Sequence, residues 1–253
     1  MQDAASLHVD WRVAPRPDTE VVIFLHDGLG ATGSWQTMPE RIAAATGLSA
    51  MLYDRWGYGR SAPREAFPFG FMEQEVPVLL DLLDREGIAR PHLVGHSDGG
   101  SIALLFAARH PERVRSVVTE AAHVFVEPET QAGIRALLEA KAAGQMPRWL
   151  ERLHGERAAA LLDAWGSGWL TPAHARWNIE DCLAQVRCPL LVIQGDRDEF
   201  GTLAQVEAIV SRAPNAQRWV ARDCGHTPHA EAADHFAERV SAFLRAHMAH
   251  TPD

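Results

Sequence analysis

The chain is predicted to be an α/β protein with a mostly parallel, doubly wound sheet, because short apolar runs alternate with helical segments. Residues 21–25 form a continuous β-branched and aromatic run, which is typical of a strand buried on both faces of a parallel sheet. Residues 71–86 have apolar side chains at helical spacing and end before Gly87. Repetition of this pattern predicts right-handed strand–helix–strand units.

The composition narrows the class of protein. The 253 residues suffice for one large α/β domain or two small ones, and 47% hydrophobic residues can form a full core. A net charge of −9 without a stripe of Lys or Arg argues against a nucleic-acid partner. No apolar run reaches the roughly 18 residues that span a bilayer, so no membrane partner is expected.

The first ten residues and the cysteines indicate where the protein is located and whether it binds a metal or a cofactor. Residues 1–10 lack the basic start and apolar core of a signal peptide, and three cysteines without a repeating spacing fit reduced thiols. We therefore expect a cytoplasmic protein. Neither CxxC nor HExxH occurs, so no metal is expected, and nothing in the chain calls for a cofactor.

The predicted elements follow one another along the chain. The predicted strands cover residues 7–13, 21–25, 48–53, 91–94, 114–119, 189–194 and 218–220. The predicted helices outside the middle segment cover residues 38–45, 71–86, 101–109, 203–212 and 236–247. No strand is predicted at about residues 126–187, so the strand–helix alternation is interrupted in this middle segment.

Residues 126–187 are predicted to be a helical insertion without strands. The helical pieces cover 134–142, 149–154, 157–165 and 178–186, and four of the eight tryptophans lie in this segment: Trp149, Trp165, Trp169 and Trp177. An insertion of this kind is predicted to be a cap over the carboxyl ends of the strands. The alternative is a second domain. We therefore divide the chain into a core domain, residues 1–125 and 188–253, and a cap, residues 126–187.

A Gly-x-Ser-x-Gly sequence lies between the predicted strand at 91–94 and the helix at 101–109. A strand that turns directly into a helix strains the residue at the apex, and the residues two before and two after must be small. Gly95 and Gly99 meet this need, so Ser97 is predicted to be an exposed nucleophile. The alternatives are a plain glycine turn or a phosphate-binding loop.

A serine nucleophile needs a histidine base, and the base needs an acid that orients it. Loops that follow predicted strands carry Ser97, Asp198 and His226 in the order nucleophile, acid, histidine. His226 is preferred over the other histidines for its place after the last strand, and His96 is expected to point away from the site. Asp196 and Glu120 remain alternative acids.

The attacked carbonyl would become an oxyanion, which needs two N–H donors. The backbone N–H of Asp98, at the start of the helix, is one candidate. The second is expected from Gly28 or Leu29, in a loop with three glycines. The carboxylates of Asp98 and Asp27 would oppose the oxyanion unless they turn away.

These motifs together resemble the α/β-hydrolase superfamily, in its small single-domain branch of serine hydrolases with a helical cap. The matching segments are residues 26–30 with Trp35, 54–61, 95–99, 195–198 and 225–228. The resemblance implies an α/β-hydrolase fold with a sheet of about eight strands and a cap inserted after strand 6. It also implies a carboxylic-ester hydrolase first, with amidases, lactonases and C–C bond hydrolases as neighbours. Asp27 departs from the common His-Gly at the oxyanion loop.

The substrate is expected to be a small molecule. Trp149, Trp165, Trp169 and Phe71 are predicted to line an apolar pocket, which favours an ester with a small or medium apolar group. The leading hypothesis is therefore a serine esterase that works through an acyl-enzyme, as a monomer or homodimer. A C–C bond hydrolase of a dioxo acid is the first alternative, because cap arginines could hold a carboxylate. A lactonase, an amidase and a non-catalytic ligand-binding module are the others.

Overall fold

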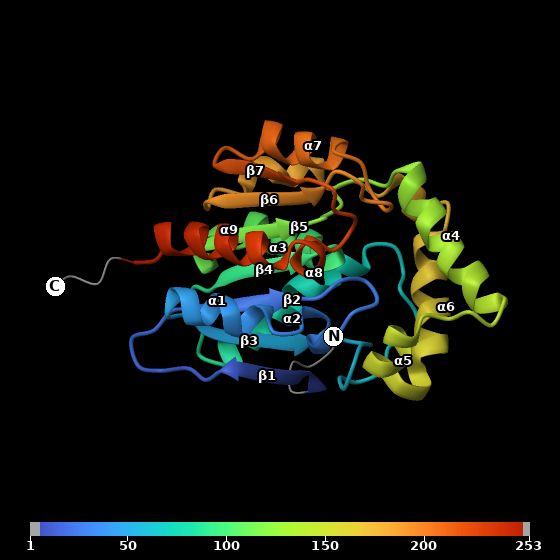
Figure 1. Cartoon of the computed structure of the whole chain (residues 1–253), viewed down its shortest axis with the longest axis horizontal. Coiled ribbons are helices and arrows are strands. Elements are labelled where there is room, and N and C mark those ends of the chain that lie inside the picture. Colours follow the sequence, from blue (N-terminus) through green and yellow to red (C-terminus); the bar gives the residue numbers. More distant parts are fainter. Residues whose placement is uncertain (1–5, 250–253) are drawn as a thin grey trace.

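The computed structural model describes residues 6–249, which contain a seven-stranded sheet (Figure 1). The strand order is β1-β3-β2-β4-β5-β6-β7, with β1 antiparallel to β3 and the other pairs parallel. The strands are β1 (His8–Val13), β2 (Val21–Leu25), β3 (Ser49–Asp54), β4 (His92–His96), β5 (Ser116–Glu120), β6 (Leu190–Gly195) and β7 (Ala216–Ala221). The parallel strands therefore end at one edge, where the loops that carry the candidate residues meet.

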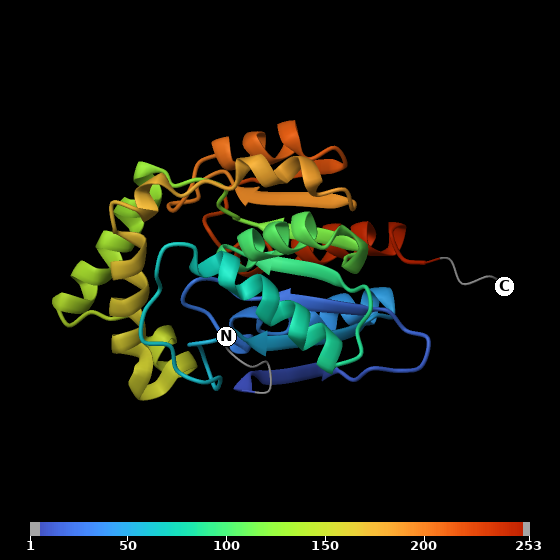
Figure 2. The same cartoon turned by 180° about the vertical axis from the view of Figure 1, so that it is seen from behind.

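Helices cover both faces of the sheet (Figures 1 and 2). On one face, α1 (Met38–Thr46) packs against α9 (Ala233–Ala246), near the short α8 (Pro228–Glu231). On the other face, α2 (Phe71–Arg85) packs against α3 (Asp98–Arg109), and α3 packs against the 3-10 segment η6 (Glu180–Gln185), which also contacts α7 (Ala204–Arg212). Two apolar clusters result, one on each side of the sheet. The inner strands β2 to β6 are buried because helices cover both faces, whereas the edge strands β1 and β7 are partly exposed.

The segment between β5 and β6 is helical and lies beyond the carboxyl ends of the strands (Figure 1). Its α-helices are α4 (Pro128–Ala142), α5 (Arg148–His154) and α6 (Ala158–Trp169), and its 3-10 turns are η4 (Gly155–Arg157), η5 (His174–Arg176) and η6. We call residues 128–169 the inserted helices. His154 joins them to the core, because its ring nitrogens contact Gly59 N at 2.9 Å and Leu29 O at 2.8 Å.

The structure differs from the expectations in strand number and in element boundaries. The described residues form seven strands where about eight were expected, because β1 alone precedes β2. The inserted helices consequently follow the fifth strand instead of the sixth. The predicted helix at 178–186 is a 3-10 segment, and α3 begins at Asp98, three residues before its predicted start. The remaining short elements are η2 (Thr32–Trp35) and η3 (Pro111–Arg113).

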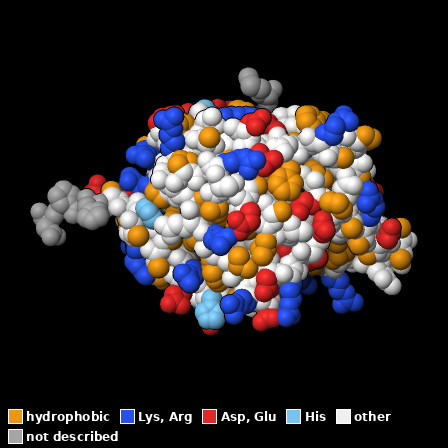
Figure 3. All heavy atoms as spheres, turned by 90° about the horizontal axis from the view of Figure 1, so that it is seen from above, with side chains coloured by type: hydrophobic (Ala, Val, Ile, Leu, Met, Phe, Trp, Pro, Cys, Tyr) orange, Lys and Arg blue, Asp and Glu red, His pale blue; other side chains and the backbone are white. Residues whose placement is uncertain are grey.

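The helices and the surface charge of the structure can be compared with what a membrane or a nucleic acid would require of a binding partner. In residues 6–249, no helix combines the length and the apolar character that a bilayer span requires. Figure 3 shows one face of the molecule, on which acidic and basic side chains are interspersed among apolar ones. No stripe of Lys and Arg crosses that face.

Candidate active site

Ser97 occupies the strained turn that the sequence predicts. It lies between the end of β4 and the start of α3, with φ 52° and ψ −120°, a backbone conformation that non-glycine residues rarely adopt. A Cβ at Gly95 would lie 2.3 Å from the carbonyl oxygen of Gly99, and a Cβ at Gly99 would lie 2.3 Å from that of Leu25. Only glycine therefore fits at both positions. Ser97 is 7% exposed and lines a cavity.

His226, which lines the same cavity, forms a hydrogen bond with the buried side chain of Asp198. Nδ1 of His226 lies 2.8 Å from Oδ1 of Asp198, which also accepts the backbone N–H of Phe200 at 2.9 Å. Burial opposes charge on the His226 ring, but the Asp198 carboxylate outweighs it, and the pKa of His226 is raised. The same ion pair outweighs burial at Asp198 and lowers its pKa. The pair can thus hold a proton on Nδ1 and leave Nε2 for proton transfer.

His96 lies beside His226, although the sequence suggested that it would point away. The two ring centroids are 5.0 Å apart, and Nε2 of His96 lies 2.9 Å from the backbone carbonyl oxygen of His226. Because a carbonyl oxygen only accepts, Nε2 of His96 carries the proton. Burial lowers the pKa of His96 to about 3, so its ring is neutral. His96 therefore ties the loop that carries His226 to the end of β4.

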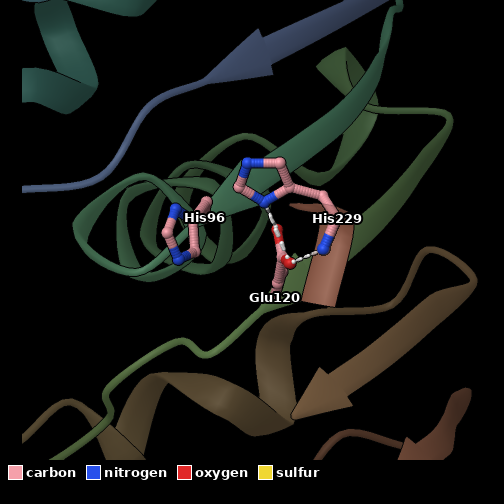
Figure 4. A group of neighbouring side chains, drawn as sticks. All are labelled: His96, Glu120 and His229. Atoms are coloured by element: carbon pink, nitrogen blue, oxygen red, sulfur yellow. Dashed lines mark hydrogen bonds and ion pairs between the residues drawn. The ribbon is translucent and has the colours of Figure 1, made fainter. Parts of the chain in front are cut away.

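Glu120, an alternative acid, contacts a different histidine (Figure 4). Its Oε1 accepts the backbone N–H of His229 at 2.6 Å, and its Oε2 lies 2.9 Å from Nδ1 of the same residue. The charge of His229 outweighs burial and lowers the pKa of Glu120, while Glu120 raises the pKa of His229. The other alternative, Asp196, is exposed. The geometry thus singles out Asp198 as the partner of His226.

His96, Glu120 and His229 are also the one group in residues 6–249 whose donor atoms lie close enough to hold a metal ion, within 4.8 Å of one another (Figure 4). Most of the donor atoms of these three side chains already form hydrogen bonds. Both oxygens of Glu120 contact His229, and His96 contacts the carbonyl of His226. The raised pKa of His229 favours a protonated ring, which offers no lone pair to a metal. We therefore interpret the group as a hydrogen-bonded anchor for the histidine loop.

Backbone N–H groups near Ser97 can face a developing oxyanion. The N–H of Asp98 stands at the start of α3, where the helix dipole favours negative charge. Of the two candidates for the second donor, the N–H of Leu29 has an acceptor, Oδ2 of Asp27 at 3.4 Å. This leaves Gly28 as the better second donor. A Cβ on Gly28 would lie 2.7 Å from the indole of Trp165, so this position requires glycine.

The Asp98 carboxylate is held by a buried network that the sequence did not reveal. Trp165 Nε1, from α6, donates to Oδ2 of Asp98 at 3.2 Å, and Nη2 of Arg55 lies 3.7 Å from the same oxygen. Nη2 of Arg55 also donates to the carbonyl oxygen of Asp27 at 2.7 Å, and Arg55 is fully buried. Arg55 thus offsets the charge of Asp98. The only signal for it was an arginine in the loop motif at residues 54–61.

The cavity has a volume of about 310 Å³ and lies between the loops of the core and the inserted helices. Trp149, Trp165 and Trp169 line it, together with residues that the sequence did not single out: Thr130, Ile134, Leu137 and Phe200. Phe71 does not line it, which corrects its predicted role. Phe71 begins α2 and is fully buried, and its ring packs against Phe67 and Trp169.

Comparison with known proteins identifies the family of the chain. Residues 20–181 match the alpha/beta hydrolase fold family, and the chain belongs to this family. It is a hydrolase of the α/β fold, since its named relatives are hydrolases of several kinds.

Two similar proteins and one solved structure illustrate the range of hydrolases that the chain resembles. The human serine hydrolase BPHL is 28% identical over 205 residues, which cover 78% of this chain and 70% of BPHL. The 2-hydroxy-6-oxo-6-phenylhexa-2,4-dienoate hydrolase of Burkholderia cepacia is 27% identical over 253 residues, which cover 89% of this chain and 87% of that enzyme. The crystal structure of MGS-M2, an alpha/beta hydrolase enzyme from a Medee basin deep-sea metagenome library, superposes with a TM-score of 0.79 at 18% identity, over 98% and 96% of the two chains.

Proposed function

We propose that the protein is a serine hydrolase that cleaves a small or medium carboxylic ester through an acyl-enzyme. Ser97 is the nucleophile, His226 the base and Asp198 the acid. The observation that carries the proposal is the 2.8 Å contact between Asp198 Oδ1 and Nδ1 of His226, a histidine that lines the same cavity as Ser97. A solvated surface histidine has no need of a buried carboxylate partner, and the Asp198 side chain is 1% exposed.

The reaction takes two steps. Ser97 Oγ attacks the ester carbonyl carbon while Nε2 of His226 takes its proton, and the N–H groups of Asp98 and Gly28 bind the oxyanion. His226 then gives the proton to the leaving alcohol, and the acyl-enzyme forms. Water attacks the acyl carbon with His226 again as base, and the acid and free Ser97 result. Asp198 holds the tautomer and stabilises the imidazolium in both steps.

We propose that the inserted helices and their flanks, residues 126–187, act as a cap. The tryptophans at 149, 165 and 169 belong to these helices and line the cavity, and His154 joins α5 to two core loops. A cap of this kind would exclude water from the oxyanion and limit the size of the acyl or alcohol group.

Activity-based labelling tests the proposal directly. We expect a fluorophosphonate to modify Ser97, identified by mass spectrometry of the tagged peptide, and short p-nitrophenyl esters to be hydrolysed. Ser97→Ala should abolish both results, whereas Ser211→Ala, an exposed control in α7, should change neither. Labelling of another residue, or equal turnover by Ser97→Ala, would overturn the assignment.

The B. cepacia relative favours one alternative, hydrolysis of a C–C bond in a dioxo acid. A dienoate carries a carboxylate, which calls for a nearby cation. Among the described residues, those that line the cavity include no Lys or Arg, and the guanidinium of Arg157 in the cap hydrogen-bonds the carbonyls of Gly59 and Ser61. The charge of the lining therefore supports an ester over a dioxo acid. Faster loss of a coloured dienoate than of any ester would reverse this preference.

Other bonds and a non-catalytic role remain as weaker alternatives. Lactones and amides would use the same residues and differ only in the leaving group, so a substrate panel separates them. A ligand-binding module would retain ligand-dependent stabilisation in Ser97→Ala but show no turnover in the unmodified protein.

A further inference from the structure

The acidic lining of the cavity points to the charge of the substrate. Among residues 6–249, the carboxylates of Asp27, Asp98 and Glu199 line the cavity together with Ser97, and no Lys or Arg does. The cavity also contains His96 and His123, and burial lowers the pKa of His96 to about 3 and that of His123 to about 4, so both rings are neutral near pH 7.

Asp98 offers the most enclosed of these carboxylates. Its Oδ2 faces the indole of Trp165 and the guanidinium of Arg55. Its Oδ1 is buried and has no hydrogen-bond partner among the described residues, and the residue is 1% exposed. A buried carboxylate oxygen without a donor is costly, which suggests that a donor arrives with a ligand.

Asp27 and Glu199 lack a compensating cation. In the part of the chain that the structure describes, neither forms an ion pair with Lys or Arg, and the His96 ring, whose Nδ1 lies 3.8 Å from Oδ1 of Asp27, is neutral. Both carboxylates raise the pKa of His226, after the larger effects of burial and of Asp198, so their charge is felt at the reacting centre. They would oppose an oxyanion there unless a positive charge enters with the substrate.

The walls of the cavity suit an organic cation as well. Trp149, Trp165 and Trp169 come from the inserted helices and Phe200 from the loop after β6. Aromatic faces attract ammonium groups through their negative quadrupole, most strongly where water is excluded. Carboxylates and indoles together are a combination that recognises an ammonium group.

We propose that the preferred substrate is an ester that carries an ammonium group close to the reacting carbonyl. The proposal rests on the esterase function proposed above and names its substrate class. The substrate's positive charge would lie close to Asp27 and Glu199 and would offset their effect on the oxyanion, while its N–H or C–H groups would face the unpartnered Oδ1 of Asp98. The proposal refines the expectation of an apolar ester. The tryptophans that line the cavity would contact the carbon atoms attached to the ammonium nitrogen, and the carboxylates would face its charge.

A pair of isosteric esters provides the test. Choline acetate and 3,3-dimethylbutyl acetate have the same shape and differ in one charge, and monoethyl succinate carries the opposite charge. Hydrolysis is followed by acid release in a pH-stat at low ionic strength. We expect kcat/KM for the choline ester to exceed that for the neutral isostere at least tenfold, with the anionic ester slowest, and the ratio to fall in 0.5 M salt.

Variants identify the source of the preference. Asp27→Asn and Glu199→Gln should each lower the choline-to-neutral ratio severalfold, whereas Glu129→Gln, an exposed control in α4 outside the cavity, should leave the ratio unchanged. A ratio at or below one in the unmodified protein would overturn the cation proposal. If Ser97-dependent hydrolysis of the neutral ester continued, the esterase proposal would stand.

Binding to Ser97→Ala separates the two proposals if turnover is absent. Calorimetry should give a Kd for the choline ester at least tenfold lower than for its neutral isostere, and Asp27→Asn should raise the Kd of the choline ester alone. Equal binding of the two isosteres would refute the cation proposal whatever the activity.

Discussion

Replacing Asp198 with Asn is expected to slow ester hydrolysis by about a thousandfold in a protein that remains folded. The Asp198 carboxylate contacts Nδ1 of His226 at 2.8 Å and accepts the backbone N–H of Phe200 at 2.9 Å. Asparagine keeps the shape and can still accept one of these hydrogen bonds. It removes the negative charge that faces the imidazolium, and its amide favours the wrong tautomer of His226.

The size of the effect follows from the geometry of this pair. With Nδ1 and Oδ1 in contact, the two charge centres are about 4 Å apart, and at an effective dielectric constant of about 20 they interact by about 4 kcal/mol. The imidazolium exists only once Ser97 has lost its proton, so this energy is lost from the transition state. About 4 kcal/mol corresponds to about a thousandfold in kcat.

The assay compares kcat for p-nitrophenyl butyrate with the thermal unfolding midpoint of each variant. Asp196→Asn is the matched control, because this carboxylate is two residues away and exposed, and its kcat should stay within twofold of the unmodified protein. Glu120→Gln tests the alternative acid. If Asp198→Asn retained more than a tenth of the activity while folded Glu120→Gln lost a thousandfold, the assignment of the acid would be wrong.

Three further outcomes follow from the site. The raised pKa of His226 predicts that kcat/KM falls at acid pH with a midpoint above 6.5, because the protonated ring cannot act as base; a midpoint below 6 contradicts this. Gly28→Ala should reduce kcat/KM at least tenfold, since its Cβ would lie 2.7 Å from Trp165, and Gly28→Ala combined with Trp165→Ala should recover part of the loss. Glu120→Gln should lower the free energy of unfolding by about 3 kcal/mol, since it leaves the charge of His229 buried. The Glu120–His229 ion pair stabilises the fold only at pH values above the lowered pKa of Glu120 and below the raised pKa of His229, where both groups are charged. Denaturant titrations across pH should therefore show that the difference in unfolding free energy between the unmodified protein and Glu120→Gln is largest within this pH window.

The sequence predicted the inner strands well because they are buried on both faces and contain short apolar runs, whereas the edge strands β1 and β7 are partly exposed. Element ends were less predictable. Strands β4 and β5 extend to His96 and Glu120, polar residues that are buried through specific partners and not through their own apolarity. The middle segment was predicted as helical without strands, but the 3-10 form of η6 depends on its packing against α3 and α7.

The candidate site was predictable where its residues follow a motif order and not where they depend on packing. The contact between Asp198 and His226 was inferred from their places after successive strands. Arg55 and the anchor at Glu120 were not, because each acts through a partner far along the chain. Phe71 was misplaced because an aromatic residue at a helix start can face either the core or the cavity, and here it faces the core.

The hydrogen bond from His96 to the carbonyl of His226 attaches the loop that carries His226 to the residue directly before Ser97. The anchor between Glu120 and His229 reinforces it from the next strand. Neither link involves residues 128–169, so the position of His226 beside β4 does not depend on the inserted helices that line the cavity. Exchanging these helices for those of a relative should therefore redirect substrate choice while the labelling of Ser97 persists.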